Sequence, residues 1–313
     1  MKTISPLPLL TERTGKEIIM AGERKSGQGA VVVTGASSGI GRACALHLDR
    51  LGSAVFAGVR RVEDADSLKR ESAGRITPLL MDVTDGPSLA AAADSVAGAV
   101  GEAGLSGLVN NAGVVVSGPL EFVPLSGIGR QFEVNVLGQI AVIQAFLPLL
   151  RKARGRIVNM GSIAGRMASP FIGPYAASKY ALEAITDALR LELLPWGITV
   201  SIIEPGSVAT PIWGKARAAA GKMAHDFPPR ARELYGPAIN AHRSAAEKSA
   251  RAGIDPDIVA RAVEHALFAK KPKTRYLVGR GARLRAFLKR VLPDRLLDRL
   301  VLRHMGLPGK PAP

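Results

Sequence analysis

Short apolar runs rich in valine, isoleucine and leucine alternate with longer amphipathic segments along most of the chain. Seven runs have the composition of strands buried on both faces, at residues 30–34, 54–59, 76–81, 107–110, 155–160, 198–203 and 276–278. Helical patterns lie between them, at residues 42–48, 87–100, 127–151 and 256–269 and from residue 173 onward. This alternation predicts one α/β domain over residues 29–280, built on a parallel, doubly wound sheet.

Three segments depart from this alternation. Residues 1–28 are polar and interrupted by glycine and proline, which predicts a mobile leader. Residues 207–252 are rich in alanine, lysine and arginine, and we expect them to form a mobile lid over a site. Residues 281–313 are predicted to be a basic amphipathic helical extension, because apolar side chains recur at helical spacing from Leu284 to Leu292 and again further on.

The net charge of +16 is concentrated near the C-terminus, where residues 270–313 hold 13 lysines and arginines against two aspartates. The apolar stripe of this region packs on the body or on a second subunit, or it lies on an anionic membrane surface, and the sequence leaves both open. Nucleic acid is not predicted as a partner, because no recognition motif or stacking aromatics accompany the charge. The single cysteine fits a reducing compartment, so we predict a cytoplasmic protein, with peripheral membrane contact through residues 281–313 as the open alternative to packing. No uninterrupted 18-residue apolar run is found, so no transmembrane span is expected.

The first strand leads directly into a glycine-rich turn and a helix. Gly35 permits a tight turn, Gly39 lets the backbone approach a pyrophosphate, and Gly41 allows the helix to pack closely on the strand. The helix N-terminus then offers free N–H groups and a positive dipole end to an anion. The order strand, turn, helix therefore predicts a dinucleotide cradle rather than a glycine-rich turn without a ligand.

The second strand ends at Val59 and is followed by two arginines, Arg60 and Arg61. In dinucleotide folds an acidic residue at this point hydrogen-bonds the adenosine ribose and repels a 2′-phosphate. Here the arginines could pair with such a phosphate, which favours NADP over NAD. A solvated turn is the alternative interpretation of the two arginines.

Tyr175 and Lys179 lie four residues apart, so a helix places both on one face. Pro174 suits the first position of that helix. An ammonium beside a phenol favours the phenolate and so lowers the phenol pKa toward the range of a general acid/base. Taken alone, the pair could equally be ordinary helix surface.

Read together, five motifs resemble the short-chain dehydrogenase/reductase family over roughly residues 29–280. They are residues 34–41 (TGASSGIG), residues 110–113 (NNAG), Ser162, Tyr175 with Lys179, and residues 205–206 (PG). The resemblance implies a Rossmann-type fold and an NAD(P)-dependent oxidoreductase. It points to members that interconvert lipophilic ketones or aldehydes and alcohols of the steroid or retinoid kind. The second hypothesis is a non-catalytic NADP-binding protein with a regulatory or tethering role. The presence of Ser162, Tyr175 and Lys179 together argues against it, because a protein without catalysis has no chemical need for all three.

The resemblance also assigns roles to four residues. Tyr175 would be the proton donor or acceptor, and Lys179 would lower the phenol pKa and hold the nicotinamide ribose. Ser162 would hydrogen-bond the substrate oxygen, and Asn135 would support a water-linked proton relay to Lys179. If Ser162 were the nucleophile of a hydrolase, it would need a partnering histidine and an acid, but no histidine of the chain lies in a motif.

The remaining site residues follow from the same comparison. The cofactor is expected to contact Gly35, Ser37, Ser38, Gly39, Ile40, Gly41, Arg60, Asp82, Val83, Asn111, Ala112, Gly113, Tyr175, Lys179, Pro205, Gly206, Val208 and Thr210. The substrate is expected to contact Ser162, Met167, Phe171, Tyr175, Ile212 and Trp213, unless the apolar members of this set merely pack the lid. Asp82 and Asn111 alone could be ordinary turn residues. We expect a homo-oligomer and no catalytic metal, since no cluster has metal-ligand spacing.

Overall fold

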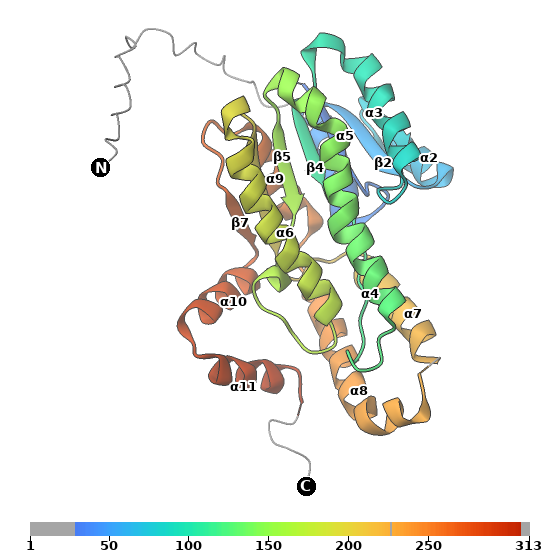
Figure 1. The fold of residues 1–313 in the computed structure, drawn as a ribbon, viewed down its shortest axis with the longest axis vertical. Helices are drawn as coiled ribbons and strands as arrows, with labels where there is room; N and C mark the ends of the chain where they lie inside the picture. The colour runs from blue at the N-terminus through green and yellow to red at the C-terminus, as the bar shows by residue number, and fades with distance from the viewer. Residues whose placement is uncertain (1–28, 226, 308–313) are drawn as a thin grey trace, which may run out of the picture.

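A computed structural model describes residues 29–225 and 227–307 of the chain. Its centre is a seven-stranded sheet in the order β3-β2-β1-β4-β5-β6-β7, in which every pair of neighbours is parallel (Figure 1). The strands are β1 Ala30–Val33, β2 Ala54–Val59, β3 Ile76–Leu80, β4 Gly107–Asn110, β5 Arg156–Met160, β6 Thr199–Pro205 and β7 Arg275–Val278. The predicted doubly wound, Rossmann-type α/β fold is confirmed.

Helices cover both faces of this sheet and bury two apolar clusters against it. One cluster joins the sheet to α1 Gly39–Arg50, α2 Val62–Glu71 and α9 Pro256–Phe268. The other lies under α3 Gly86–Val100 and α5 Gly138–Ala153, on the face that α6 Gly173–Glu192 also covers (Figure 1). Short 3-10 turns complete the described chain, at Gly101–Ala103, Ile163–Gly165 and Leu194–Trp196. Because both faces are covered, strands β1, β2, β4 and β5 are almost continuously buried, whereas the edge strands β3 and β7 alternate in burial.

The long helix predicted at residues 127–151 is α4 Leu125–Phe132, a π-helical turn at Glu133–Leu137, and α5 in continuous succession. By length and composition alone this run, Leu125–Ala153, could cross a membrane, although the sequence had predicted no span. More than half of its most apolar window is buried, with Val142, Phe146 and Leu150 inside the core. That burial is typical of a core helix.

The remaining helices lie beyond the carboxyl ends of the strands. The pair α7 Ile212–His225 and α8 Pro229–Arg251 projects from one side of this edge, within the segment expected to form a lid (Figure 1). The pair α10 Arg280–Val291 and α11 Asp294–His304 lies on the other side, and both carry the amphipathic pattern predicted for the extension. The expected leader, residues 1–28, and residues 308–313 lie outside the described residues.

Helix α2 is an element that the sequence pattern did not single out. Its N-terminus directly follows Arg61, whose guanidinium forms two 3.0 Å hydrogen bonds to Asp64 in the first helical turn. Only Leu68 of this helix is buried, so its apolar periodicity is weak. The missed helix matters for the site because it fixes the direction of Arg61.

Candidate active site

The turn after β1 has the backbone of an anion cradle. Gly35 and Gly39 have φ angles of +65° and +57°, which side chains of other residues rarely adopt. A Cβ on Gly41 would lie 2.3 Å from the Gly35 carbonyl oxygen, so only glycine fits between this turn and helix α1. The Ser38 side chain makes no capping hydrogen bond to the first turn of α1 within the described chain. The backbone N–H groups there are therefore available to an anionic ligand.

Polar side chains tie this turn to the loop after β4. The buried Thr34 hydroxyl accepts hydrogen bonds from the backbone N–H groups of Asn111 and Ala112, both at 2.9 Å. The Asn111 amide in turn donates to the Thr34 carbonyl oxygen at 2.9 Å. These contacts hold the ends of β1 and β4 together, so the two loops form one wall.

A cavity of about 380 Å³ opens over this wall, and we call it the glycine-loop cavity. It is lined by most of the residues expected at the cofactor: Gly35, Ser37, Ser38, Gly39, Ile40, Arg60, Asp82, Val83, Asn111, Ala112, Gly113 and Thr210. A wall of glycine-rich backbone with the cationic side chains Arg60, Arg130 and Lys215 around it fits a dinucleotide.

Six residues expected at the cofactor lie outside this lining: Tyr175 and Lys179 on α6, and four residues at or near the sheet edge. Gly41 packs against Gly35, and Pro205 ends β6. Gly206 lies against Ala282 of α10, where a Cβ would be 3.3 Å from the Ala282 nitrogen. Val208 is buried and pairs with Ile254 in an isolated parallel bridge. These positions support the edge of the site rather than its surface.

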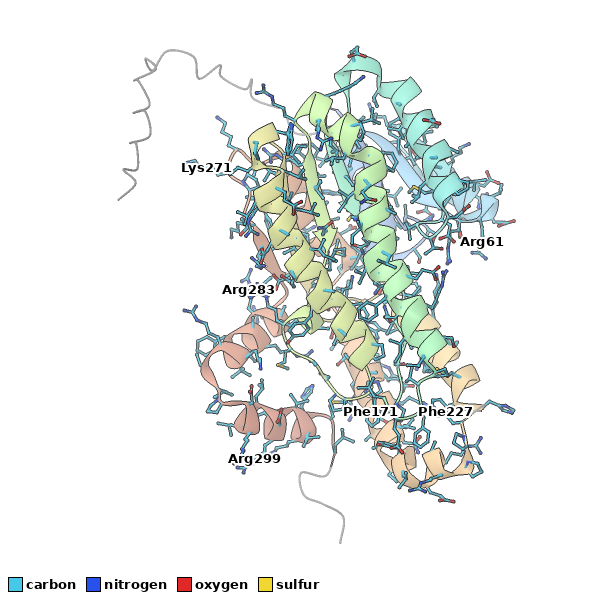
Figure 2. All side chains as sticks on the ribbon, in the orientation of Figure 1. Arg61, Phe171, Phe227, Lys271, Arg283 and Arg299 are labelled. Carbon is cyan, nitrogen blue, oxygen red and sulfur yellow. The ribbon has the colours of Figure 1, made fainter. Side chains whose placement is uncertain are left out.

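The two arginines after β2 are separated by the structure. Arg60 lines the glycine-loop cavity, whereas Arg61 lies outside it with its guanidinium on Asp64 (Figure 2). Two further cations that the sequence did not indicate also line the cavity. Arg130 of α4 pairs with Glu133, and the Nζ of Lys215 of α7 lies 3.3 Å from Ser38 Oγ. Helix α7 thus brings a positive charge to the cradle.

Tyr175 lies in the first turn of α6. Its side chain is buried next to helix α7. Burial raises the pKa of its phenol, and a hydrogen bond with the Ser162 hydroxyl offsets part of that rise. The Ser162 Oγ also accepts a 3.1 Å hydrogen bond from the Ala164 N–H, which fixes the serine after β5. The Tyr175 ring meets the Trp213 ring edge-on, with centroids 6.1 Å apart. The predicted phenol and hydroxyl are therefore together.

Lys179 lies one helical turn beyond Tyr175, with its Nζ 5.9 Å from the tyrosine ring centroid. The ammonium donates a 2.6 Å hydrogen bond to the carbonyl oxygen of Met160, at the end of β5. Burial lowers the pKa of Lys179 to about 8, against an opposing effect of Glu183. The resemblance implied a lowered phenol pKa, whereas burial of Tyr175 outweighs the Ser162 hydrogen bond and holds the pKa of the phenol above its usual value.

Asn135 lies in the π-helical turn between α4 and α5 and is fully buried. Its Oδ1 accepts a 2.8 Å hydrogen bond from the Val114 N–H, and its Nδ2 donates to the Val114 carbonyl oxygen at 3.0 Å. The same Nδ2 lies 3.3 Å from Ser178 Oγ on α6. The side chain therefore joins the β4 loop to the Tyr175 helix, and π-turns are frequent at such functional positions.

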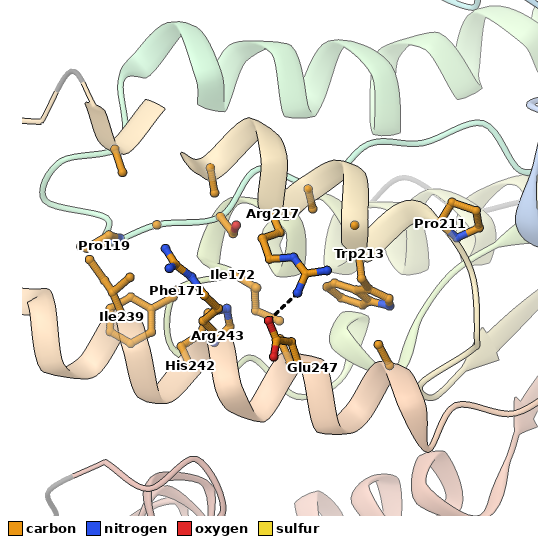
Figure 3. Close-up of a pocket in the computed structure, with 18 of the residues that line it drawn as sticks. Pro119, Phe171, Ile172, Pro211, Trp213, Arg217, Ile239, His242, Arg243 and Glu247 are labelled. Carbon is orange, nitrogen blue, oxygen red and sulfur yellow. Dashed lines mark hydrogen bonds and ion pairs between the residues drawn. The ribbon is translucent and has the colours of Figure 1, made fainter. Parts of the chain in front are cut away.

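A second cavity of about 310 Å³ lies between α7, α8, residues 117–119 and residues 171–172, and we call it the α7–α8 cavity (Figure 3). Thr210, Pro211 and Ala216 line both this cavity and the glycine-loop cavity, so the two adjoin. Of the residues expected at the substrate, Phe171 and Trp213 line it. Phe171 adopts a φ of +66°, a strained conformation for a phenylalanine.

The other residues expected at the substrate lie elsewhere. Ile212 faces the glycine-loop cavity, since helix geometry turns it away from its neighbour Trp213. Met167 lines a third cavity, together with Tyr180 and Leu297, against helix α11. Arg217, His242 and Arg243 are polar residues of the α7–α8 cavity that sequence reasoning missed, because they belong to no motif and α7 and α8 meet only in the folded chain. Within the described residues, no group of three His, Cys, Asp or Glu side chains could hold a metal ion.

Comparison with known proteins places these features in context. The family model described as "short chain dehydrogenase" matches residues 29–221. An NADPH-dependent 3-dehydrocapnine reductase from Ornithobacterium rhinotracheale is 37% identical over 279 residues, which are 88% of this chain and 96% of that protein. Human retinol dehydrogenase 5 is 39% identical over 274 residues, 86% of each protein. A crystal structure of a Burkholderia cenocepacia short chain dehydrogenase in complex with NADP is 25% identical with a TM-score of 0.67, covering 90% of this chain and 98% of that one.

Proposed function

The chain belongs to the short-chain dehydrogenase/reductase family, and from that premise we propose that it interconverts a lipophilic ketone or aldehyde and its alcohol, with Tyr175 as the general acid/base. It is an NAD(P)-dependent oxidoreductase acting on CH–OH groups. One observation carries the finer proposal. The Tyr175 phenol pairs with Ser162, and its ring touches Trp213 in the wall of the α7–α8 cavity, where that cavity adjoins the glycine-loop cavity.

The chain has to hold one oxygen and move one proton. When bound, the nicotinamide supplies or accepts the hydride at the carbonyl carbon. In the direction of reduction, Tyr175 gives its phenolic proton to the carbonyl oxygen, and the Ser162 hydroxyl stabilises the charge that develops there. In oxidation the phenolate takes the proton back. Because burial keeps the pKa of the phenol high, Tyr175 is ready as a proton donor at neutral pH, which suits reduction.

Lys179 and Asn135 support this proton transfer. The Lys179 ammonium lies close enough to Tyr175 to stabilise the phenolate that remains after proton donation. Its pKa of about 8 allows it to exchange a proton near neutral pH. The polar atoms of the Asn135 side chain are already hydrogen-bonded to Val114 and Ser178. In this proposal Asn135 therefore positions the helix that carries Tyr175. A water relay to Lys179 would use other atoms of the π-turn.

NADP is the cofactor, with NAD as an alternative, in keeping with the NADPH-dependent relative and with related structures that hold NAD or NADP. We infer that Arg60 gives NADP its advantage, because its position after β2 faces the adenosine ribose in this fold and it lines the glycine-loop cavity. Lys215 of α7 adds a positive charge to that cavity, where the third cation, Arg130, is paired with Glu133.

Arg60→Ser is expected to raise the KM for NADPH by about 10–100-fold, because the variant loses charge-assisted hydrogen bonds to the 2′-phosphate. The KM for NADH should change little, since NADH has no such phosphate. Arg61→Ser is the matched control, since Arg61 is paired with Asp64 outside the cavity. Steady-state rates with both cofactors and a panel of lipophilic ketones test this prediction and the proposed activity together. Equal losses with NADPH and NADH, or an effect of Arg61→Ser as large as that of Arg60→Ser, would contradict the assignment.

We also infer that helices α10 and α11 rest on an anionic membrane surface. Part of the predicted apolar stripe is uncovered: Leu284, Phe287 and Val291 of α10 are at least half exposed, whereas Leu297 of α11 is buried. Basic side chains surround the stripe, at Arg280, Arg283, Arg285, Lys289, Arg290, Arg295, Arg299 and Arg303, and Arg283 and Arg299 extend away from the body (Figure 2). An amphipathic surface with these charges fits the boundary of an anionic bilayer. Such contact would make a cytoplasmic protein peripherally membrane-associated, and the homo-oligomer expected from the resemblance stays a prediction.

Phe287→Glu is expected to weaken binding to phosphatidylglycerol vesicles at least about tenfold, because it removes an apolar anchor and adds a repelled charge. Leu191→Glu is the control, since it makes a similar change at an exposed apolar residue at the far end of α6. Sedimentation with anionic and zwitterionic vesicles measures both variants. If the wild-type protein stays in the supernatant, or if both variants lose binding equally, the membrane surface is not α10 and α11, and a second copy of the chain is the better occupant.

A further inference from the structure

The α7–α8 cavity contains charges that the chemistry at Tyr175 does not use. Arg217 projects into it from α7 and Arg243 from α8 (Figure 3). The Arg217 guanidinium is paired with Glu247, also on α8. Over residues 29–225 and 227–307, no carboxylate pairs with Arg243. Arg243 is exposed at the edge of this largely apolar cavity, and it leaves the lining with two guanidinium groups against one carboxylate.

His242 adds a polar atom without a partner to the same cavity. Its Nδ1 is buried, and among the described residues no hydrogen-bond partner meets it. The ring packs against Phe171, with centroids 5.4 Å apart. Burial lowers the pKa of His242, so the imidazole is neutral at pH 7 and can donate one hydrogen bond from a ring nitrogen. An unpartnered polar atom beside an unpaired guanidinium indicates a polar ligand group.

The helices set the distance between these groups and the reacting centre. Trp213 touches the Tyr175 ring at one end of the cavity. Arg217 follows Trp213 by one turn of α7, about 5 Å along the axis. Helix α8 returns alongside α7 (Figure 3), and Arg243 precedes Glu247, the partner of Arg217, by one further turn. Its backbone is therefore offset from that of Trp213 by about 12 Å along the helix axes. The charge is therefore several bonds away from the carbonyl that Tyr175 would protonate.

We propose that the α7–α8 cavity selects an amphipathic carbonyl substrate whose acidic head group, several bonds from the reacting carbon, is bound by Arg243. This rests on the proposed function and narrows its substrate class. Apolar side chains such as Phe171, Ile172, Trp213 and Ile239 would cover the hydrocarbon part. Arg243 would pair with the anion while His242 donates a hydrogen bond to it. A neutral lipophilic ketone would leave both groups without partners. Its binding would therefore be weaker, because polar groups of a binding site that stay unpaired cost free energy.

The test compares a keto acid with its uncharged ester. With NADPH, the wild-type chain is expected to reduce 7-oxododecanoate with a kcat/KM about 10–100-fold above that for methyl 7-oxododecanoate, the advantage of a charge-assisted hydrogen bond. Arg243→Gln should bring this ratio close to one by slowing the acid and sparing the ester. Arg251→Gln, on the same helix but outside the cavity, should retain the wild-type ratio. An ester reduced as well as the acid by the wild-type protein, or an unchanged ratio in Arg243→Gln, would overturn the proposal.

A binding measurement separates this proposal from the proposed reaction. Calorimetry on the NADPH-loaded chain would compare dodecanoate with dodecanol, neither of which needs to react. We expect dodecanoate to bind about 10–100-fold more tightly in the wild-type and Arg251→Gln proteins, and the two ligands to bind alike in Arg243→Gln. If dodecanoate shows this selectivity but no ketone is reduced, the oxidoreductase assignment fails and the anion site stands. If dodecanol binds as tightly as dodecanoate, the anion site fails whatever the activity.

Discussion

Replacing Tyr175 with phenylalanine is expected to lower kcat for ketone reduction by about 10²–10⁴-fold, the usual contribution of a positioned general acid, with the Kd for NADPH changed less than about twofold. The variant loses only the hydroxyl that pairs with Ser162, because a phenylalanine ring can keep the edge-on contact with Trp213. Cofactor binding should persist, since the glycine-loop cavity is lined by residues other than Tyr175.

The matched control for this variant is Tyr180→Phe. Tyr180 lies on the same helix, is 42% exposed and lines the cavity against α11 instead of the two cavities of the site. It should keep wild-type turnover. Stopped-flow rates and NADPH titration of the two variants separate chemistry from binding. Equal kcat values for Tyr175→Phe and the wild-type protein would remove Tyr175 from the mechanism.

Lys179→Met is the variant with the second largest expected effect, a loss of about 10²–10³-fold in kcat, comparable to removing one preorganised electrostatic contact. The buried ammonium lies next to the Tyr175 ring, and methionine occupies similar space without charge. The variant should remain folded, because losing the costly buried charge offsets losing the 2.6 Å hydrogen bond to Met160. Lys152→Met, at a surface ion pair with Glu102, is the control.

The pH dependence of unfolding gives this prediction an independent readout. Burial lowers the pKa of Lys179 from 10.5 to about 8, so between these values the unfolded chain binds more protons than the folded one. The free energy of unfolding contributed by this group therefore rises with pH across that window, by about 3 kcal/mol in total. Urea titrations at pH 7 and pH 10 give the free energy of unfolding of the wild-type protein and of Lys179→Met. The difference between the two proteins should increase by this amount from pH 7 to pH 10. A flat difference would mean that Lys179 is not buried in its charged form.

Much of the site could be predicted because its residues belong to short local motifs. The spacing of Tyr175 and Lys179 needs only one helix, and the structure provides it as α6 with Pro174 in its first turn. The alternation of apolar runs and helical segments was enough for the parallel sheet, because right-handed crossovers leave few other topologies. The glycine turn was recognisable for the same reason, since Gly35, Gly39 and Gly41 follow each other at fixed intervals.

Features that depend on distant segments could not be predicted in this way. Arg60 and Arg61 are equivalent in the sequence, and only helix α2, with Asp64 in its first turn, directs one of them away from the cavity. The sequence likewise gave no reason to separate Met167 from Phe171, yet the two line different cavities. Burial also reversed one expectation, because the pKa of the Tyr175 phenol rises where a neighbouring Lys179 suggested that it would fall. Desolvation depends on the whole surrounding fold, which a local motif does not contain.

The central claim is that this chain transfers a hydride between a nicotinamide and a lipophilic carbonyl compound with Tyr175 providing the proton. The most direct measurement uses NADPH deuterated at the transferring position, a panel of lipophilic ketones, and mass spectrometry of the alcohol products. We expect one deuterium on the carbinol carbon for each NADPH consumed by the wild-type protein, and almost none in the same time with Tyr175→Phe. Tight binding of NADPH with no label in any product would contradict it and would favour a cofactor-binding role without catalysis.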